Sequence, residues 1–87
     1  MLLKPIYAIA HHRNRPDDVN NALTEGANAI ECDVFYDDGQ ICIQHDAFED
    51  GTPLPIFLEC LRVIADHHGD RFALLIFDLK DNILMSS

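Results

Sequence analysis

The sequence predicts an α/β fold in which β-strands alternate with helices and pair in parallel. Apolar runs alternate with segments of helical spacing, and glycine or proline marks the junctions between them. The run at residues 72–77 is apolar throughout, which is typical of a parallel strand covered on both faces. Parallel strands joined by helices require right-handed crossovers, so their carboxyl ends are expected to meet at one edge of the sheet.

The first half of the chain is predicted to contain one helix among three strands. Pro16 begins the helix, and Asp17 and Asp18 follow in its first turn, where the helix dipole favours acidic side chains. Gly26 is suited to end it, since glycine readily adopts the left-handed conformation that closes a helix. The predicted order is a strand at 5–10, a polar loop at 11–15, the helix, a strand at 26–36, a turn at 37–39 and a strand at 40–45.

The second half is predicted to contain a longer helix and a final strand. Helical spacing relates the apolar residues of about 54–68, which are Phe57, Leu58, Leu61, Ile64 and Ala65. Gly69 ends this helix, and the strand at 72–77 leads into Asp78-Leu79-Lys80. Residues 81–87 are interpreted as the start of a further element.

Composition limits the class of protein. The 87 residues correspond to one small domain, and the net charge of −9 argues against nucleic-acid binding and offers no polybasic patch to anionic membranes. No segment reaches the roughly 20 apolar residues of a transmembrane helix. Residues 1–5 are too short for a signal peptide, so we expect a cytoplasmic chain or a targeting sequence outside it. The odd number of cysteines and their spacing argue against a zinc knuckle and a full disulfide framework. Their apolar contexts indicate buried thiols at Cys32, Cys42 and Cys60.

Two acidic residues on one predicted strand are the strongest functional signal. Glu31 and Asp33 lie two positions apart, so their side chains point to one face, while Ile30, Cys32 and Val34 point to the other. Neighbouring carboxylates raise each other's pKa unless a positive charge lies between them. Because Mg²⁺ prefers carboxylate oxygens and water, we expect this pair to bind it.

Further polar residues fall at the ends of the other predicted strands. His11 follows the first strand, His45 ends the third, and Asp78 and Lys80 end the fourth. Enzymes with a (β/α) barrel carry their active sites at this edge. Asp78 would complete a three-carboxylate Mg²⁺ site, the two histidines would serve as acid and base around a phosphorus, and Lys80 would contact a phosphate oxygen.

Structural roles stay open as alternatives for these residues. The paired acids could lie at a solvated edge or in salt bridges, and Lys80 could extend its ammonium to solvent. His12, His67 and His68 are interpreted as ordinary loop or helix-end histidines. The acids interpreted as solvated turn and loop residues are Asp37, Asp38 and Asp50.

Taken together, these segments resemble a known family. The residues that carry the resemblance are Ala10-His11-x-x-Asn14, Gly26-Ala-Asn-Ala-Ile-Glu-x-Asp-Val34, His45 and Asp78-Leu-Lys80. They are similar to the N-terminal part of the phospholipase D toxins related to sphingomyelinase D, within the glycerophosphodiester phosphodiesterase superfamily. The resemblance implies that residues 1–87 are a truncated N-terminal part of a (β/α)₈ barrel, with about four of its eight strands.

The resemblance also implies an activity and a set of roles. The implied reaction is Mg²⁺-dependent cleavage of the headgroup of sphingomyelin or a lysophospholipid, often through a cyclic phosphate, by proteins that are often secreted. The roles carried over are acid and base for His11 and His45, Mg²⁺ ligands for Glu31, Asp33 and Asp78, and substrate phosphate contact for Lys80.

Departures from the family pattern leave the substrate open. The spider toxins have disulfide-forming cysteines in the loop after the second histidine, whereas residues 46–50 contain none. His45-Asp46 is instead the pair of the wider superfamily, although that superfamily has His-Arg-Gly where this chain has His11-His12-Arg13-Asn14. We favour a non-spider member of this branch, inactive as an isolated fragment. The alternatives are a phosphodiesterase of small soluble glycerophosphodiesters and a truncated product without activity.

Overall fold

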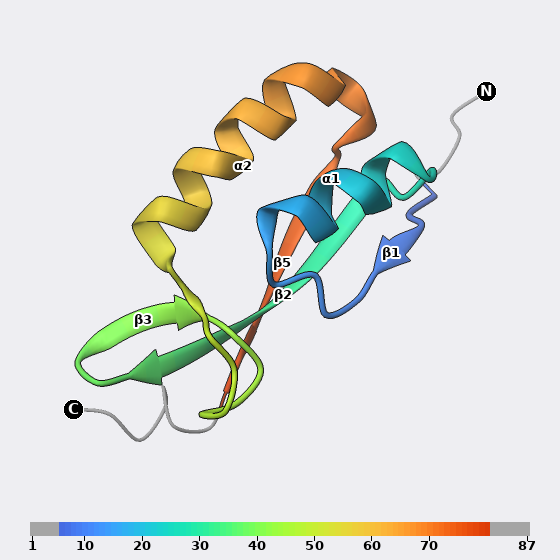
Figure 1. Cartoon of the computed structure of the whole chain (residues 1–87). Helices are drawn as coiled ribbons and strands as arrows, with labels where there is room; N and C mark the ends of the chain where they lie inside the picture. Colours follow the sequence, from blue (N-terminus) through green and yellow to red (C-terminus); the bar gives the residue numbers. More distant parts are fainter. Residues whose placement is uncertain (1–5, 81–87) are drawn as a thin grey trace.

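Two helices lie against one side of a mixed β-sheet in the computed structural model, which describes residues 6–80 (Figure 1). The α/β class is therefore confirmed, while the element expected at 81–87 lies outside the described residues. The elements are, in chain order, β1 (Ile9–Ala10), α1 (Pro16–Thr24), β2 (Ala29–Asp37), β3 (Gln40–Ile43), β4 (Thr52–Pro53), α2 (Leu54–His68), the 3₁₀ turn η1 (Gly69–Arg71) and β5 (Leu74–Leu79). Both helices begin where the sequence predicted them, whereas the short β4 was not expected.

β2 is the central strand of the sheet. β1 and β5 pair with it in parallel, and β3 pairs with it antiparallel. Val34 is the partner of Ile43 in β3 and of Leu79 in β5, so β3 and β5 lie on opposite edges of β2. β4 then pairs antiparallel with β3. The prediction that all strands pair in parallel is therefore wrong, and the described residues contain three parallel strands rather than four.

The turn between β2 and β3 explains this correction. Asp38 and Gly39 both have positive φ, at 48° and 82°, which is the conformation of a two-residue hairpin turn. A hairpin joins only antiparallel neighbours, because parallel strands need a crossover of a dozen or more residues. The Asp-Gly pair therefore imposes an antiparallel return that the alternation of strands and helices does not reveal.

The hydrophobic core lies between the sheet and the two helices. Ile30, Cys32 and Val34 are buried on the helix-facing side of β2, as their alternation predicted. Their buried neighbours are Val19, Ala22 and Leu23 of α1, Ile43 of β3, and Phe57 and Leu61 of α2. Because this face of β2 is buried under the helices, Glu31 and Asp33 project from its other face.

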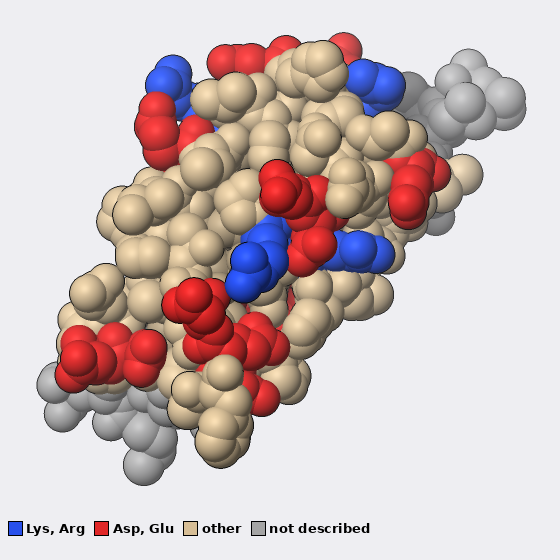
Figure 2. All heavy atoms as spheres, in the orientation of Figure 1, with Lys and Arg blue, Asp and Glu red and all other residues tan. Residues whose placement is uncertain are grey.

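Acidic side chains outnumber basic ones in this chain, with 15 Asp and Glu against 6 Lys and Arg. In the space-filling view of Figure 2, acidic side chains form several groups and basic side chains are fewer, in keeping with the net charge of −9. Neither of the two helices within residues 6–80 combines the length and the apolar character that crossing a bilayer requires.

Candidate functional site

Three carboxylates converge on the face of the sheet opposite the core. The parallel register makes Asp33 of β2 the direct partner of Asp78 in β5, and Glu31 lies two residues before Asp33 on the same face. One oxygen from each of Glu31, Asp33 and Asp78 lies within 4.8 Å of the other two. The structure thus brings together the three residues that the sequence singled out as metal ligands.

This donor set suits a hard divalent cation. Carboxylate oxygens are the ligands that Mg²⁺ takes from proteins, usually alongside water and substrate phosphate. The Asp33 side chain is only 3% exposed and that of Asp78 is 52% exposed, so one side of the cluster is anchored in the protein and the other opens to solvent. An ion held here would keep coordination positions open on the Asp78 side.

Asn14 holds the buried Asp33 carboxylate in place. The Asn14 Nδ2 donates to Asp33 Oδ2 at 2.9 Å, and the Asp33 backbone N–H donates to Asn14 Oδ1 at 2.8 Å. Burial by itself raises the pKa of Asp33, but the hydrogen bonds from Asn14 and Lys80 and the nearby positive charge hold it below the ordinary value. Asp33 is therefore an anion at neutral pH despite its burial.

Lys80 bridges two of the three carboxylates. Its Nζ lies 2.9 Å from Asp33 Oδ1 and 2.9 Å from Asp78 Oδ2. These two acceptors raise the pKa of the Lys80 ammonium above its ordinary value. The salt-bridge role that the sequence left open for the acids is thus present.

The two histidines expected to act as acid and base contact different carboxylates. His45 Nδ1 lies 3.5 Å from Asp33 Oδ2, and His11 Nδ1 lies 3.9 Å from Glu31 Oε1. The side chain of His11 is 74% exposed, so it lies at the border of the cluster rather than within it. The sequence-predicted set is therefore assembled, with His11 as its most peripheral member.

His12 is part of the cluster although the sequence indicated an ordinary loop residue. Its Nδ1 lies 3.2 Å from Asp33 Oδ2, its Nε2 lies 3.6 Å from Glu49 Oε1, and its ring centroid lies 4.9 Å from that of His45. The backbone of His12 has a φ of 59°, and its N–H donates to Glu31 Oε1 at 2.7 Å. Histidine is among the residues that adopt this left-handed conformation more often than most, but nothing in the sequence marks where it occurs.

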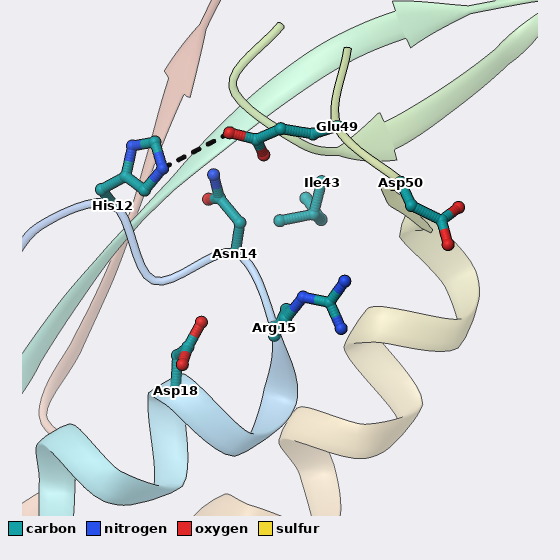
Figure 3. Close-up of a pocket in the computed structure, with 7 residues that line it drawn as sticks. All are labelled: His12, Asn14, Arg15, Asp18, Ile43, Glu49 and Asp50. Atoms are coloured by element: carbon teal, nitrogen blue, oxygen red, sulfur yellow. Dashed lines mark ion pairs between the residues drawn. The ribbon is translucent and has the colours of Figure 1, made fainter. Parts of the chain in front are cut away.

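A pocket of about 310 Å³ opens beside His12. Figure 3 shows His12 pointing toward Glu49 at one side of the pocket, next to Asn14. The lining is mostly polar and consists of His12, Asn14, Arg15, Asp18, Ile43, Glu49 and Asp50. Asp50, which the sequence indicated to be a solvated loop acid, is exposed at this pocket.

The remaining titratable candidates are not part of the cluster. His68 is buried, and its Nε2 lies 2.9 Å from Asn20 Oδ1, so it joins α2 to α1 rather than serving a site. Cys32 and Cys42 are buried and Cys60 is partly exposed, all as free thiols. Burial and the neighbouring Glu31 and Asp33 charges raise the pKa of Cys32 to about 12, which makes its thiol unreactive at neutral pH.

Comparison with known proteins gives one match. The model of the family described as Sphingomyelinase D/Phospholipase D matches residues 2–82. Neither a curated protein nor a solved structure shows a significant match to the chain. The matched range includes every residue of the carboxylate, lysine and histidine cluster.

Proposed function

Because the chain belongs to the sphingomyelinase D/phospholipase D family, we propose that it carries the catalytic residues of a phosphodiesterase that cleaves the headgroup from sphingomyelin or a lysophospholipid. The observation that carries the proposal is the convergence of three carboxylates, one ammonium and an imidazole on one face of the sheet. Phosphodiester cleavage requires stabilisation of the phosphoryl oxygens and proton transfer at the attacking and leaving oxygens. The cluster contains groups of both kinds.

Glu31, Asp33 and Asp78 are the residues that would hold Mg²⁺. When bound, the ion would neutralise negative charge that develops on the phosphoryl oxygens. The support is the chemistry of the donor set, which consists of oxygen ligands from two paired strands. Lys80 would contact a phosphate oxygen from the same side, because its ammonium already lies between Asp33 and Asp78.

His11 and His45 would act as the acid/base pair. Their contacts to Glu31 and Asp33, at 3.9 and 3.5 Å, support a division of labour, since the two imidazoles face different ends of the carboxylate pair. One imidazole would accept the proton of the attacking hydroxyl as the new O–P bond forms. The other would donate a proton to the headgroup oxygen as its bond to phosphorus breaks.

We also propose that β1, β2 and β5 are consecutive strands of a (β/α)₈ barrel. The support is that they are parallel neighbours in this order, joined through helices that cover one face of the sheet. The barrel interior would then be the face that bears Glu31 and Asp33. The isolated 87-residue chain is expected to lack activity, because closing such a barrel takes about 250 residues.

Headgroup release tests this function. Choline release from sphingomyelin and from lysophosphatidylcholine is measured for the longest expressed polypeptide that carries this chain, with Mg²⁺ and with chelator. We expect Mg²⁺-dependent release that falls by about 10²-fold or more in His45→Asn, and by a similar factor in His11→Asn. The matched control is His67→Asn, since His67 is exposed on α2 away from the cluster. Full activity in both His11 and His45 variants would refute the assignment.

Two observations favour a second substrate class. The pocket beside the cluster is lined mainly by polar side chains, and His45-Asp46 is the pair of the wider phosphodiesterase superfamily. A small water-soluble glycerophosphodiester would suit such a lining. Turnover of glycerophosphocholine is therefore compared with that of sphingomyelin, and a strong preference for the lipid would eliminate this second candidate.

A further inference from the structure

We propose that His12, Asp33 and His45 form a second cation site, which binds a transition-metal ion such as Zn²⁺. One ligand atom from each of the three residues lies within 4.8 Å of the other two. This site and the three-carboxylate cluster share Asp33 and differ in their other ligands. His12 has no part in the proposed hydrolysis, so this inference does not depend on the enzymatic function.

The distances from Asp33 to the two histidines fit a tetrahedral ion. Zn²⁺ binds imidazole nitrogen and carboxylate oxygen at about 2.0–2.1 Å, which places neighbouring ligand atoms of a tetrahedron about 3.3 Å apart. His12 Nδ1 and His45 Nδ1 lie 3.2 and 3.5 Å from Asp33 Oδ2. Both histidines therefore turn the same ring nitrogen toward one carboxylate oxygen, at the separation that a shared ion requires.

Neighbouring groups already orient two of the three ligands. The His12 Nε2 faces Glu49 Oε1 at 3.6 Å, and a carboxylate on the far nitrogen is the usual partner of a metal-binding histidine. Asn14 donates one hydrogen bond to Asp33 Oδ2, which leaves the second lone pair of that oxygen available to an ion. Lys80 binds the other oxygen, Oδ1, and so does not occupy this position.

Ligand chemistry separates this site from the Mg²⁺ site. Two imidazoles and one carboxylate favour Zn²⁺, Cu²⁺ or Ni²⁺, whereas three carboxylates favour Mg²⁺. Because Asp33 is common to both sets, the two ions should compete. If the proposed hydrolysis holds, bound Zn²⁺ would also withdraw His45 from proton transfer, and Zn²⁺ would inhibit the enzyme.

Metal titration of the untagged chain tests the site. Zn²⁺ affinity is measured by calorimetry, and Co²⁺ serves as a spectroscopic probe whose visible absorption reports tetrahedral nitrogen and oxygen ligands. All variants carry Cys60→Ser, because Cys60 is the partly exposed thiol and could bind Zn²⁺ itself. His12→Asn is the central variant, since asparagine tolerates the positive φ found at position 12 and lacks the imidazole.

Two variants are expected to have opposite effects on the affinities for the two ions. His12→Asn weakens Zn²⁺ binding by about tenfold or more and leaves Mg²⁺ affinity within about twofold. Asp78→Asn is expected to weaken Mg²⁺ binding and to leave Zn²⁺ affinity nearly unchanged, because Asp78 belongs only to the carboxylate set. The matched control is His11→Asn, which removes the neighbouring exposed imidazole and should leave Zn²⁺ affinity unchanged.

Several outcomes would overturn the site. Unchanged Zn²⁺ affinity in His12→Asn would do so, as would an equal loss in His11→Asn or an octahedral Co²⁺ spectrum. Circular dichroism establishes that each variant is folded. Should His12→Asn not fold, Glu49→Gln replaces it, with an expected weakening of several-fold, and no weakening there would count against the site. A phosphodiesterase assay that shows no activity would leave this result unaffected, so the two proposals fail separately.

Discussion

At the scale of single residues, Asp33 is the side chain on which the site depends. It is almost fully buried and is held by Asn14, by Lys80 and by the two histidines at its Oδ2. A buried carboxylate is costly unless it is paired and hydrogen-bonded, and here the contacts that offset this cost come from residues outside β2. Folding and site assembly are therefore coupled through this one residue.

Asn14→Ala is expected to destabilise the protein and weaken the metal site together. The substitution leaves the buried Asp33 N–H and carboxylate each short of one hydrogen bond, which typically costs about 1–3 kcal/mol. Urea denaturation measures the loss of stability, and Mg²⁺ calorimetry should show a lower affinity. The control is Asn21→Ala, since Asn21 is exposed on α1. If the two variants were equally stable, the hydrogen bonds from Asn14 to Asp33 would not contribute to stability as expected.

The sequence predicted the site residues on the strands better than those in the loop at residues 11–15. Alternation with period two placed Glu31 and Asp33 on one face, and the burial of Ile30 and Cys32 on the other confirms it. His12 could not be found in this way, because its inward direction follows from a left-handed φ in an irregular loop. Asn14 was noted only in the family resemblance, since a buried amide gives no periodic signal.

At the scale of elements, a buried histidine joins the two helices. His68 of α2 contacts Asn20 of α1, and burial, with smaller effects from Arg71 and His67, lowers its pKa below 6.5. The folded state therefore binds a proton at His68 less readily than the unfolded state does. The contribution of neutral His68 to stability should be fully present above about pH 6.5, where this residue is neutral in both states. It should decline as the pH falls below that value.

The corresponding prediction is a pH dependence that His68→Gln removes. Thermal denaturation is followed between pH 7.5 and pH 5 for the wild type, for His68→Gln and for His67→Gln. We expect the wild type and His67→Gln, whose altered residue is exposed, to lose stability in parallel as the pH falls. A smaller loss in His68→Gln supports the helix contact, and an identical slope in all three proteins would contradict it.

The loop from β3 to β4 depends on a close approach at Gly51. A Cβ added there would overlap the side chain of the fully buried Gln44, whose Nε2 donates to Asp46 O and Glu49 O. Gly51→Ala should therefore destabilise the protein by about 1–3 kcal/mol and displace the loop that carries Glu49. Urea denaturation measures this loss, with Asp50→Ala as the exposed neighbouring control. A Gly51→Ala protein as stable as the control would show that the packing is not tight.

The order of the elements was predictable, but one pairing was not. Helix starts at Pro16 and near Leu54 follow from proline and from apolar spacing, and both are confirmed. The alternation of strands and helices suggested parallel pairing throughout, whereas the Asp38-Gly39 turn makes β3 a hairpin partner of β2. The two-residue turn makes β3 antiparallel to β2, because two residues cannot form the crossover that a parallel pair needs.

For the molecule as a whole, β5 is an edge strand of the described sheet. Within the described part of the chain it pairs only with β2, and Leu74, Phe77 and Leu79 are exposed hydrophobic residues. An unpaired apolar edge is a template for a further strand, from the same polypeptide or from a second copy. The barrel proposed above would continue the sheet at this edge.

The isolated 87-residue chain is therefore expected to self-associate through β5. Sedimentation should show an apparent mass that rises with concentration, and Leu79→Lys should reduce it by placing a charge on the edge strand. Ile56→Lys is the matched control, because Ile56 is an exposed hydrophobic residue of α2, away from the edge. If Ile56→Lys reduced association and Leu79→Lys did not, the contact would lie at α2 instead.

The proposed sharing of one divalent ion by Glu31, Asp33 and Asp78 is tested with a paramagnetic probe. Mn²⁺, which accepts the same oxygen ligands as Mg²⁺, is titrated into the ¹³C-labelled chain while the carboxylate signals are followed by NMR. We expect the signals of these three residues to broaden first and together, and excess Mg²⁺ to reverse the broadening. Broadening that begins at Asp37 and Asp38 and spares Asp33 would contradict it.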